Sequence, residues 1–549
     1  MQASERGSVG RDAADAGTVP LSGESQARET PPNEPGSSAG ARPRARRAWE
    51  ALAWAAGAAG LFVVLLRVAM TVGPPADAAS IALQAHDLLH GNVLLHGWLT
   101  GDVSFYTFEL PVFALAEAVL GLHLAALRVA MALIDLIVAA CAAAVAVTGS
   151  RGTARACRAV VVVAVIGAPE LVNGSRWLSI GLPDHTGTTV FLLLGCLLVD
   201  RALGWRWTAP LLCLLLCAGQ LGDVTVRYIY VPAIALVCAL QIARTRRLKS
   251  ADTAVVAAAV GSVPLSLAVR AVLRHLGAYQ MVAPRTALAP VSSWPHNAEV
   301  TWQQLRTVFG AQAPGGLLVG DALFGWACLL AVAVGFGMTL WRWRTARRVD
   351  QVLVVAIAAN LGAYAISTLA SPLTPQELTG VPVLGAVLVA RALMPASLPR
   401  RWAAALAAPA FAAVLVPLCL VAAQPPTVSF RQPLATWLQA HGLRHGLAMY
   451  WDAPDVNLLT SGEVQLRAVI AKDGKINPFE WETENSWFNP TEDYANFVAC
   501  VRSYPLFSST AERFFGRPAS IRYAGDWVIL IYHRNLIKQL TPVVLPATQ

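Results

Sequence analysis

Long apolar segments recur along the chain from residue 49 to residue 423, and polar loops separate them. A helix that crosses a bilayer needs about twenty predominantly apolar residues, and several of these segments reach that length. The shorter segments leave their exact ends open, and one short pair would suit a re-entrant hairpin. The pattern predicts an all-α polytopic membrane bundle of about eleven transmembrane helices. The expected spans are residues 49–71, 123–148, 159–172, 186–199, 208–222, 228–243, 253–272, 322–341, 352–371, 378–393 and 402–423.

The loops between successive apolar segments alternate between two kinds. One kind is short and basic, and the other is longer and holds acids, histidine, tryptophan and proline. Because Lys and Arg accumulate in cytoplasmic loops, this alternation places the amino terminus in the cytoplasm and the carboxy-terminal region outside. All ten histidines fall on the predicted outer side, which marks that face as the one that carries polar chemistry. The basic loops hold Arg151, Arg155 and Arg158; Arg201 and Arg206; Arg244, Arg246, Arg247 and Lys249; Arg342, Arg344, Arg347 and Arg348; and Arg400 and Arg401.

The polar parts of the chain are a tail, two long outer loops and a terminal domain. Residues 1–47 lack large apolar side chains and are expected to be a disordered cytoplasmic tail. Within the transmembrane domain, residues 48–423, the long outer loops are residues 72–122 and 273–320. Residues 424–549 have the composition of a soluble domain, and we expect a small α/β extracytoplasmic domain there.

Local signals predict secondary structure within these polar parts. Pro75 followed by Asp77 is typical of a helix start, and residues 108–120 continue as a second, interfacial helix. In the terminal domain, alternating strands flank glycine-containing turns at residues 472–475 and 524–526. Each of these turns predicts a β-hairpin.

Composition supports the membrane assignment and excludes several functions. Hydrophobic residues make up 56% of the chain and charged residues 14%, and the mean hydropathy is +0.52. Soluble domains carry about 25% charged residues, so much of this surface faces membrane lipids rather than water. The net charge of +9 arises from the short basic loops, which argues against a nucleic-acid partner. The nine cysteines show no metal-ligand spacing, and neither a phosphate loop nor a serine-hydrolase motif is present.

The layout resembles the GT-C class of membrane glycosyltransferases, which includes protein O-mannosyltransferases and the aminoarabinose transferase group. The shared features are a cytoplasmic start, one helix, a long outer loop opened by the acid Asp77, two juxtamembrane helices, further spans and an outer soluble domain. The resemblance covers most of the chain after residue 48 and depends on layout rather than on a specific motif. It implies that a sugar is transferred from a polyprenyl-phosphate donor to an acceptor on the outer face.

Asp77 is the first candidate for the catalytic carboxylate. Glycosyl transfer needs a base, or a divalent cation held by carboxylates, to activate the acceptor at the membrane surface. Many relatives open this loop with two acids, whereas Ala78 and Ala79 follow Asp77 here, so a second carboxylate would come from elsewhere. The same position also suits a residue that caps a helix, and the two roles are compatible.

Further catalytic candidates lie in the outer loops. The neighbours Asp184 and His185 fall at the mouth of the bundle, where an acid–histidine pair suits acid–base chemistry or plain loop capping. Glu109 follows Tyr106 in an aromatic stretch that could line a sugar pocket, since aromatic rings stack on sugars and carboxylates bind their hydroxyl groups. The alternative for this stretch is an interfacial aromatic belt with one solvated acid.

Charged residues near helix ends are candidates for substrate binding. Arg67 and Arg270 oppose the positive-inside bias, so they would pair with the lipid phosphate or extend to outer headgroups. Glu377 opens the tenth span and faces outward, and the resemblance implies an acid near this position. Asp135 is the one acid well inside a span, and its isolation favours a helix-packing hydrogen bond over a proton path.

Two other functions are compatible with the pattern. A secondary transporter or lipid flippase would have midplane polar residues, broken helices and internal repeats, and only one midplane acid and no clear repeat are seen. A non-catalytic scaffold of the cell envelope would depend on residues 424–549 rather than on the loop acids. The outer-face glycosyltransferase is the leading interpretation, and the pattern does not identify its sugar, its acceptor or a metal.

Overall fold

The computed structural model describes residues 41–181, 185–200, 205–248, 250–282, 286–312, 320–397 and 399–543. Residues up to Ala56 and residues from Gly57 onward are two units, and the contacts described below lie within the second. Most of the expected tail falls outside the described residues, and so does the candidate Asp184.

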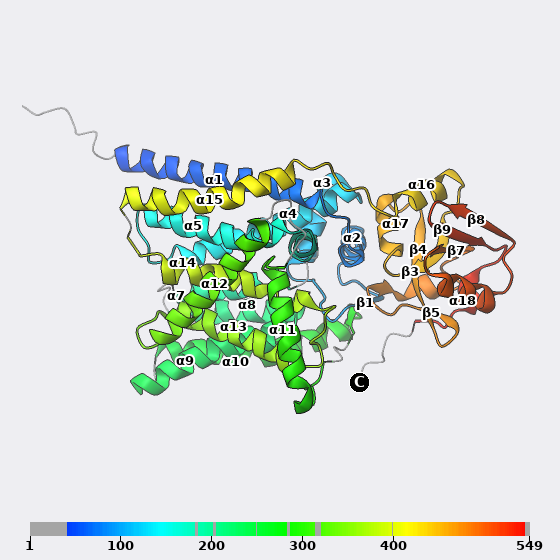
Figure 1. Ribbon diagram of the computed structural model, residues 1–549. Coiled ribbons are helices and arrows are strands. Elements are labelled where there is room, and N and C mark those ends of the chain that lie inside the picture. The colour runs from blue at the N-terminus through cyan, green and yellow to red at the C-terminus, as the bar shows by residue number, and fades with distance from the viewer. Residues whose placement is uncertain are drawn as a thin grey trace, which may run out of the picture. The chain divides into compact units, whose positions relative to one another are not determined.

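Helices lie at every expected apolar segment, and further helices fill the long outer loops (Figure 1). Among the described residues, seven helices are long and apolar enough to cross a membrane, and three shorter apolar helices accompany them. The mostly helical bundle is confirmed, whereas the expected number of spans stays a prediction. The helices are α1 (Ala41–Ala69), α2 (Ala76–Leu89), α3 (Glu109–Leu120), α4 (Leu124–Ala146), α5 (Thr153–Ile166), α6 (Asn173–Arg176), α7 (Thr189–Asp200), α8 (Trp205–Gly222), α9 (Val231–Thr245), α10 (Ala251–His275), α11 (Trp294–Val308), α12 (Gly320–Trp341), α13 (Arg348–Ile366), α14 (Gly380–Leu393) and α15 (Arg400–Ala422).

The middle of the bundle is α14, which packs against α4, α5, α12 and α13. Its close approach to α12 depends on glycine, because a Cβ at Gly385 would lie 2.8 Å from both methyl carbons of Val332. Small residues at helix crossings let backbones approach, and van der Waals packing then stabilises helices that have no hydrophobic effect between them in lipid. The turn Pro375–Leu378 leads directly into α14, so the packing of this helix determines where Glu377 lies.

The residues after α15 form a three-layer α/β domain around a mixed six-stranded sheet (Figure 1). Its elements are α16 (Gln432–Ala440), β3 (His445–Met449), α17 (Ala453–Leu459), β4 (Gln465–Lys472), β5 (Lys475–Pro478), β7 (Phe497–Val501), α18 (Pro505–Phe515), β8 (Ser520–Ala524) and β9 (Trp527–Ile531). The sheet order is β5-β4-β3-β7-β9-β8, and β3 runs parallel to both of its neighbours. Side chains of β9 point alternately to the two faces of the sheet. Trp527 and Ile529 pack with α16 and α17 on one face, and Leu530 packs with α18 on the other.

Both predicted hairpins are confirmed, as the β4–β5 and β8–β9 pairs. The turn between β4 and β5 has positive φ angles at both central residues, 53° at Asp473 and 73° at Gly474. This backbone matches the right-handed twist of the flanking strands, and it explains why an Asp-Gly pair occupies the turn.

A second, three-stranded sheet joins both long outer loops to the terminal domain. Its strands are β1 (Trp98–Thr100), β2 (Gln280–Met281) and β6 (Thr483–Glu484), with β1 in the middle. Directly before β6, the Glu482 carboxylate accepts a hydrogen bond from the Gly101 backbone N–H at 2.7 Å and another from the Gln84 side-chain amide. These bonds hold the loop that follows β1 in place, and that loop contributes to the site described below.

Asp455 is a buried acid of the terminal domain whose ionisation is expected to weaken the fold. Its side chain is fully buried, with the Arg431 guanidinium 3.5 Å away, and burial raises the pKa of the Asp455 carboxyl to about 8 despite that cation. An unfolded aspartate ionises near pH 3.8, so the unfolded state gains charge first. The contribution of Asp455 to stability is therefore complete below about pH 4 and is lost as the pH rises to about 8.

We expect Asp455→Asn to remove most of this loss, as measured by thermal unfolding of the full-length protein at several pH values. Glu463→Gln changes an exposed acid of the same domain and serves as the matched control, which should keep the wild-type pH dependence. If Asp455→Asn loses as much stability with rising pH as the wild type does, the assignment is wrong.

Candidate functional site

The site is built around His185, which lies between two carboxylates from other parts of the chain. His185 Nδ1 is 2.7 Å from Asp223 Oδ2, and His185 Nε2 is 3.4 Å from Glu377 Oε2. The Thr188 hydroxyl also donates to Asp223 Oδ2 at 2.7 Å, and the Thr225 backbone N–H donates to Oδ1 at 2.7 Å. Both imidazole nitrogens are engaged, so the partners determine the orientation of the ring.

His185, Asp223 and Glu377 are called the histidine–carboxylate group below. Their electrostatics favour an imidazolium held between two anions. Burial alone would lower the pKa of His185, but the adjacent Asp223 and Glu377 carboxylates raise that pKa well above its usual range. Burial alone would raise the pKa of Asp223, yet the His185 charge and several hydrogen bonds hold it below its usual range. The Glu377 side chain is 18% exposed and that of Asp223 is 2% exposed, so Glu377 is the more accessible carboxylate.

The first outer loop brings a further acid, Asp102, to this group. The loop pairs with the end of α8 through a β-bridge between Val103 and Asp223. Next to the bridge, the Ser104 backbone N–H donates to the Gly222 carbonyl at 2.8 Å. Asp102 therefore reaches the group by backbone pairing between segments that are far apart in sequence.

The Asp102 carboxyl is half-buried and lies within the field of the other charges. Burial raises the pKa of Asp102; the His185 charge lowers it, and the Glu377 and Asp223 charges raise it. The net direction is upward. A carboxylate whose pKa is raised is a stronger base than an ordinary aspartate.

Glu109, at the start of α3, lies close to Gly187 in the segment that follows His185. A Cβ at Gly187 would lie 2.2 Å from Glu109 Oε1 and 2.7 Å from the Phe108 ring, whereas real Cβ atoms stay beyond 3.0 Å. Glycine at this position therefore lets the segment that follows His185 approach the Glu109 carboxylate. The sequence-predicted candidates Glu109, His185 and Glu377 are thus brought together by the fold.

Irregular backbone frames this group on both sides. The π-helical segments Trp177–Gly181 and Val226–Tyr230 lie shortly before His185 and shortly after Asp223. His185 has a φ of 51°, in the left-handed region that favours glycine. π-Helical turns and strained residues are frequent at functional sites, because the surrounding structure has to hold them in place.

A polar cavity of about 670 Å³ adjoins the turn that carries Glu377. Pro375 of that turn lines the cavity, and Arg306 is the charged residue among its described lining residues. Amide and hydroxyl groups of Gln303, Gln304, Thr307 and Gln312 supply most of the other polar atoms. A cavity of this size, with one cation and several hydrogen-bonding groups, suits a sugar phosphate.

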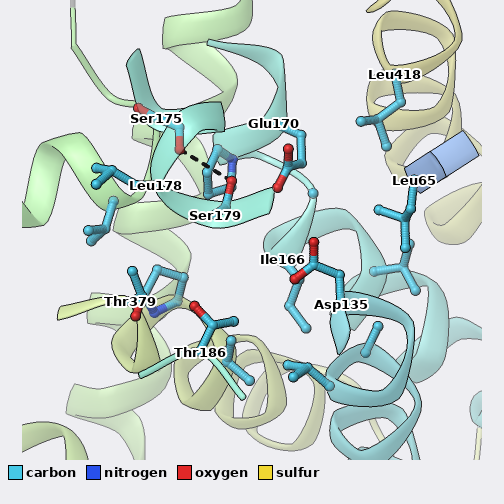
Figure 2. A pocket seen from close by; sticks show the side chains of 18 of the residues that line it. Leu65, Asp135, Ile166, Glu170, Ser175, Leu178, Ser179, Thr186, Thr379 and Leu418 are labelled. Atoms are coloured by element: carbon cyan, nitrogen blue, oxygen red, sulfur yellow. Dashed lines mark hydrogen bonds between the residues drawn. The ribbon is translucent and has the colours of Figure 1, made fainter. Parts of the chain in front are cut away.

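A second cavity lies inside the bundle and shares Leu178 with the polar one (Figure 2). It has a volume of about 50 Å³ and is mostly apolar. Thr186, the residue after His185, and Thr379, which follows the Glu377 turn, line it. Residues close in sequence to His185 and Glu377 therefore line this smaller cavity.

Asp77 and Tyr106 make other contacts. The Tyr450 hydroxyl of the terminal domain donates a hydrogen bond to Asp77, and burial raises the pKa of Asp77 although this bond lowers it. Tyr106 donates to the Val93 carbonyl at 2.7 Å, and its ring packs against that of Tyr279. The catalytic role of Asp77 and the substrate-binding role of Tyr106 stay predictions.

The two arginines proposed to bind phosphate each donate to a backbone carbonyl. Arg67 Nε donates to Ala422 at 3.1 Å, and Arg270 Nη2 donates to Gln220 at 2.8 Å. These bonds give both arginines a structural role at helix ends, and a role in binding substrate stays a prediction. Arg306, in contrast, lines the polar cavity next to Glu377.

His185 is poorly suited to bind a divalent cation in this group. Within the parts of the chain that the structure describes, no group of three or more histidine, cysteine, aspartate or glutamate side chains is arranged to hold a metal ion. His185 lies between two carboxylates that favour its protonated form, and an imidazolium has no lone pair to offer a metal. The arrangement suits proton transfer and charge stabilisation.

Sequence patterns alone missed three residues of this region, Asp102, Asp223 and Arg306. Asp223 and Arg306 lie in outer segments that the positive-inside rule identifies, but nothing local distinguishes them from capping or solvated residues. Asp102 follows Gly101 in an irregular stretch with no helix or strand period. Only the β-bridge to the end of α8 shows that it joins the group.

Comparison with known proteins gives a similarity of fold alone. No protein-family model and no curated protein matches the sequence. Two crystal structures of ArnT from Cupriavidus metallidurans are similar over most of their length. The one bound to undecaprenyl phosphate is 11% identical, with a TM-score of 0.48 and coverage of 89% of this chain and 99% of that chain. The apo structure is 12% identical, with a TM-score of 0.40 and coverage of 90% and 100%.

At this identity and TM-score no residue role is transferred to the present chain. The function proposed next is therefore argued from the residues of this chain.

Proposed function

We propose that this protein is a membrane glycosyltransferase that moves a sugar from a polyprenyl-phosphate donor to an acceptor on the outer face of the cytoplasmic membrane. One observation carries the proposal: Pro375, in the turn that also carries Glu377 of the histidine–carboxylate group, lines a polar cavity whose charged lining residue is Arg306. Transfer from a lipid phosphate requires a base for the acceptor and a cation for the phosphate, and this region of the protein offers both.

In the proposed reaction, Asp102 takes the proton from an acceptor hydroxyl. The acceptor oxygen then attacks the anomeric carbon of the sugar, and the bond from that carbon to the phosphate oxygen breaks. The electron pair leaves with the polyprenyl phosphate, whose charge Arg306 stabilises. Glu377 accepts a hydrogen bond from the sugar, and His185, whose Nε2 lies 3.4 Å from Glu377 Oε2, holds that side chain in position.

Asp77 is the alternative base, because its pKa is also raised. Its hydrogen bond with Tyr450 links α2 to the terminal domain, where α17 packs against α2. The two aspartates belong to the same outer loop, so a direct comparison of their variants distinguishes them.

Arg306→Ala is expected to weaken the binding of a short-chain polyprenyl phosphate about tenfold or more. A hydrogen bond to a charged group contributes roughly 1.5–3 kcal/mol, and about 1.4 kcal/mol corresponds to a factor of ten in affinity. Titration calorimetry on the purified full-length protein in detergent measures the change.

The control for this measurement is Arg274→Ala, which removes an exposed arginine from the last turn of α10. Its affinity should match that of the wild type. Equal affinities for the Arg306 and Arg274 variants would show that the polar cavity does not bind the lipid phosphate, and the proposal would lose its donor site.

A further inference from the structure

The small cavity inside the bundle brings two acids together from different elements (Figure 2). Asp135 comes from the middle of α4, and Glu170 comes from the short turn Pro169–Leu171 after α5. The sequence showed Asp135 as an isolated acid, and the structure corrects this interpretation. The charge of Glu170 is close enough to act on Asp135.

Oxygen atoms that line this cavity have no hydrogen-bond partner among the described residues. They are Asp135 Oδ2, Glu170 Oε2 and Thr186 Oγ1. Glu170 is 3% exposed and Thr186 is 6% exposed, so water outside the protein does not satisfy them. The helix-packing hydrogen bond expected for Asp135 is therefore not formed by Oδ2. Ser179 bonds to the Glu170 side chain, yet two carboxylate oxygens and one hydroxyl oxygen in this cavity stay without a partner, and together they call for a ligand that binds to oxygen.

The charges around the cavity do not balance. Arg176 is the cation whose field reaches Glu170, and its Nε donates to the Glu170 backbone carbonyl at 2.6 Å. The same guanidinium also interacts with Asp321 of α12. Arg176 therefore does not neutralise both cavity acids.

The other walls add no charge to the cavity lining. α1, α11 and α15 contribute Leu65, Val308 and Leu418, and α5 contributes valine, isoleucine and glycine. His185 and Glu377 of the site described above are separated from the cavity lining by one and two positions in the chain, since Thr186 and Thr379 line it. Two ionised carboxylates in such apolar surroundings would be costly.

We propose that this cavity binds one small cation, which is either a proton shared between Asp135 and Glu170 or a sodium ion held by the same oxygen atoms. The two ligands share their chemistry, a single positive charge bound by carboxylate oxygens. A volume of about 50 Å³ has room for a few water-sized particles and excludes a sugar or a lipid headgroup. Thr186 supplies a third oxygen ligand and connects the cation to the segment that carries His185.

A carbodiimide probe tests this proposal on the full-length protein without any measure of sugar transfer. Dicyclohexylcarbodiimide reacts with protonated carboxyl groups in apolar surroundings, and mass spectrometry of peptides locates the product. In choline buffer we expect labelling at Glu170 or Asp135 in acid. Labelling should fall about tenfold for each pH unit once the pair has lost its proton.

Sodium chloride added at constant pH distinguishes the two cations. If sodium suppresses the labelling and choline does not, the cavity binds sodium. If the labelling responds to pH alone, the two acids share a proton. Either result supports the proposal. Labelling that is absent in acid, or that responds to neither pH nor sodium, overturns it.

Variants give a second measurement. In Asp135→Asn the remaining acid, Glu170, lies beside Arg176, so the need for a bound cation is reduced and the response of the labelling to sodium should be lost. Glu299→Gln, which changes an exposed acid of α11, should label as the wild type does. Labelling of the remaining acid at the wild-type level would contradict a shared site. Because the wild-type measurement needs no variant, the test holds even if a variant does not fold, and it does not depend on the proposed transferase function.

Discussion

Asp102→Asn is expected to reduce sugar transfer by about 10²–10⁴-fold, the usual contribution of a general base, while the protein stays folded. The physical reason is that the amide has nearly the same shape as the carboxylate but cannot accept the acceptor's proton. The measurement is the release of polyprenyl phosphate from a labelled polyprenyl-phosphate sugar by purified protein in proteoliposomes. The affinity for the donor should change little, because Arg306 provides the phosphate contact.

The pH profile of the wild type gives an independent readout of the same group. Burial and the neighbouring carboxylates raise the pKa of Asp102, so the rate should fall with decreasing pH at a higher pH than an ordinary aspartate would cause. Asp473→Asn, in an exposed hairpin turn, serves as the control and should behave as the wild type. Unchanged transfer by Asp102→Asn would refute the assignment. Loss of transfer in Asp77→Asn instead would identify Asp77 as the base.

His185→Gln is expected to destabilise the protein by about 3–5 kcal/mol, the usual effect of removing one partner from a buried ion pair. The variant leaves the Asp223 carboxylate buried beside that of Glu377 without an intervening cation. The expected result is a loss of unfolding free energy, measured by denaturant titration in detergent. Adding Asp223→Asn to His185→Gln should restore much of the stability, because it removes the uncompensated charge.

The pH dependence of this contribution follows from the directions of the two shifts. The pKa of His185 is raised, so its contribution to stability is complete below its unfolded value of about 6.5 and disappears as the pH rises through the folded value. The pKa of Asp223 is lowered, so its contribution exists above about 3.8 and disappears as the pH falls through the folded value. A single variant as stable as the wild type, or a double variant no better than the single one, would contradict a buried ion pair.

Local signals were enough for the elements that obey a simple period. Apolar segments gave helices at each expected place, because a chain in lipid has to satisfy its backbone hydrogen bonds internally. The turn at Asp473 and Gly474 produced a hairpin, because its residues accept positive φ angles. The number of spans was harder to predict from the sequence, since helices such as α7 are too short to cross a bilayer upright.

Only part of the candidate site could be predicted from the sequence. Glu109 was selected for its place in an aromatic stretch, His185 as part of an acid–histidine pair, and Glu377 from the family resemblance. Asp102 was not recognised, because a long-range β-bridge brings it to the group, and sequence spacing does not contain that information. Asp135 was recognised as an intramembrane acid, but its partner Glu170 lies in an irregular turn after α5.

The sequence by itself determined that this is a many-spanning membrane protein with an α/β domain near its carboxy end, because hydrophobic length and turn chemistry act locally. It also predicted the sidedness of the loops from their charge. Tertiary structure alone decided which charged residues meet. His185 is held between Asp223 and Glu377, and Asp135 shares a cavity with Glu170, because helices packed through small residues bring distant segments within reach of one another.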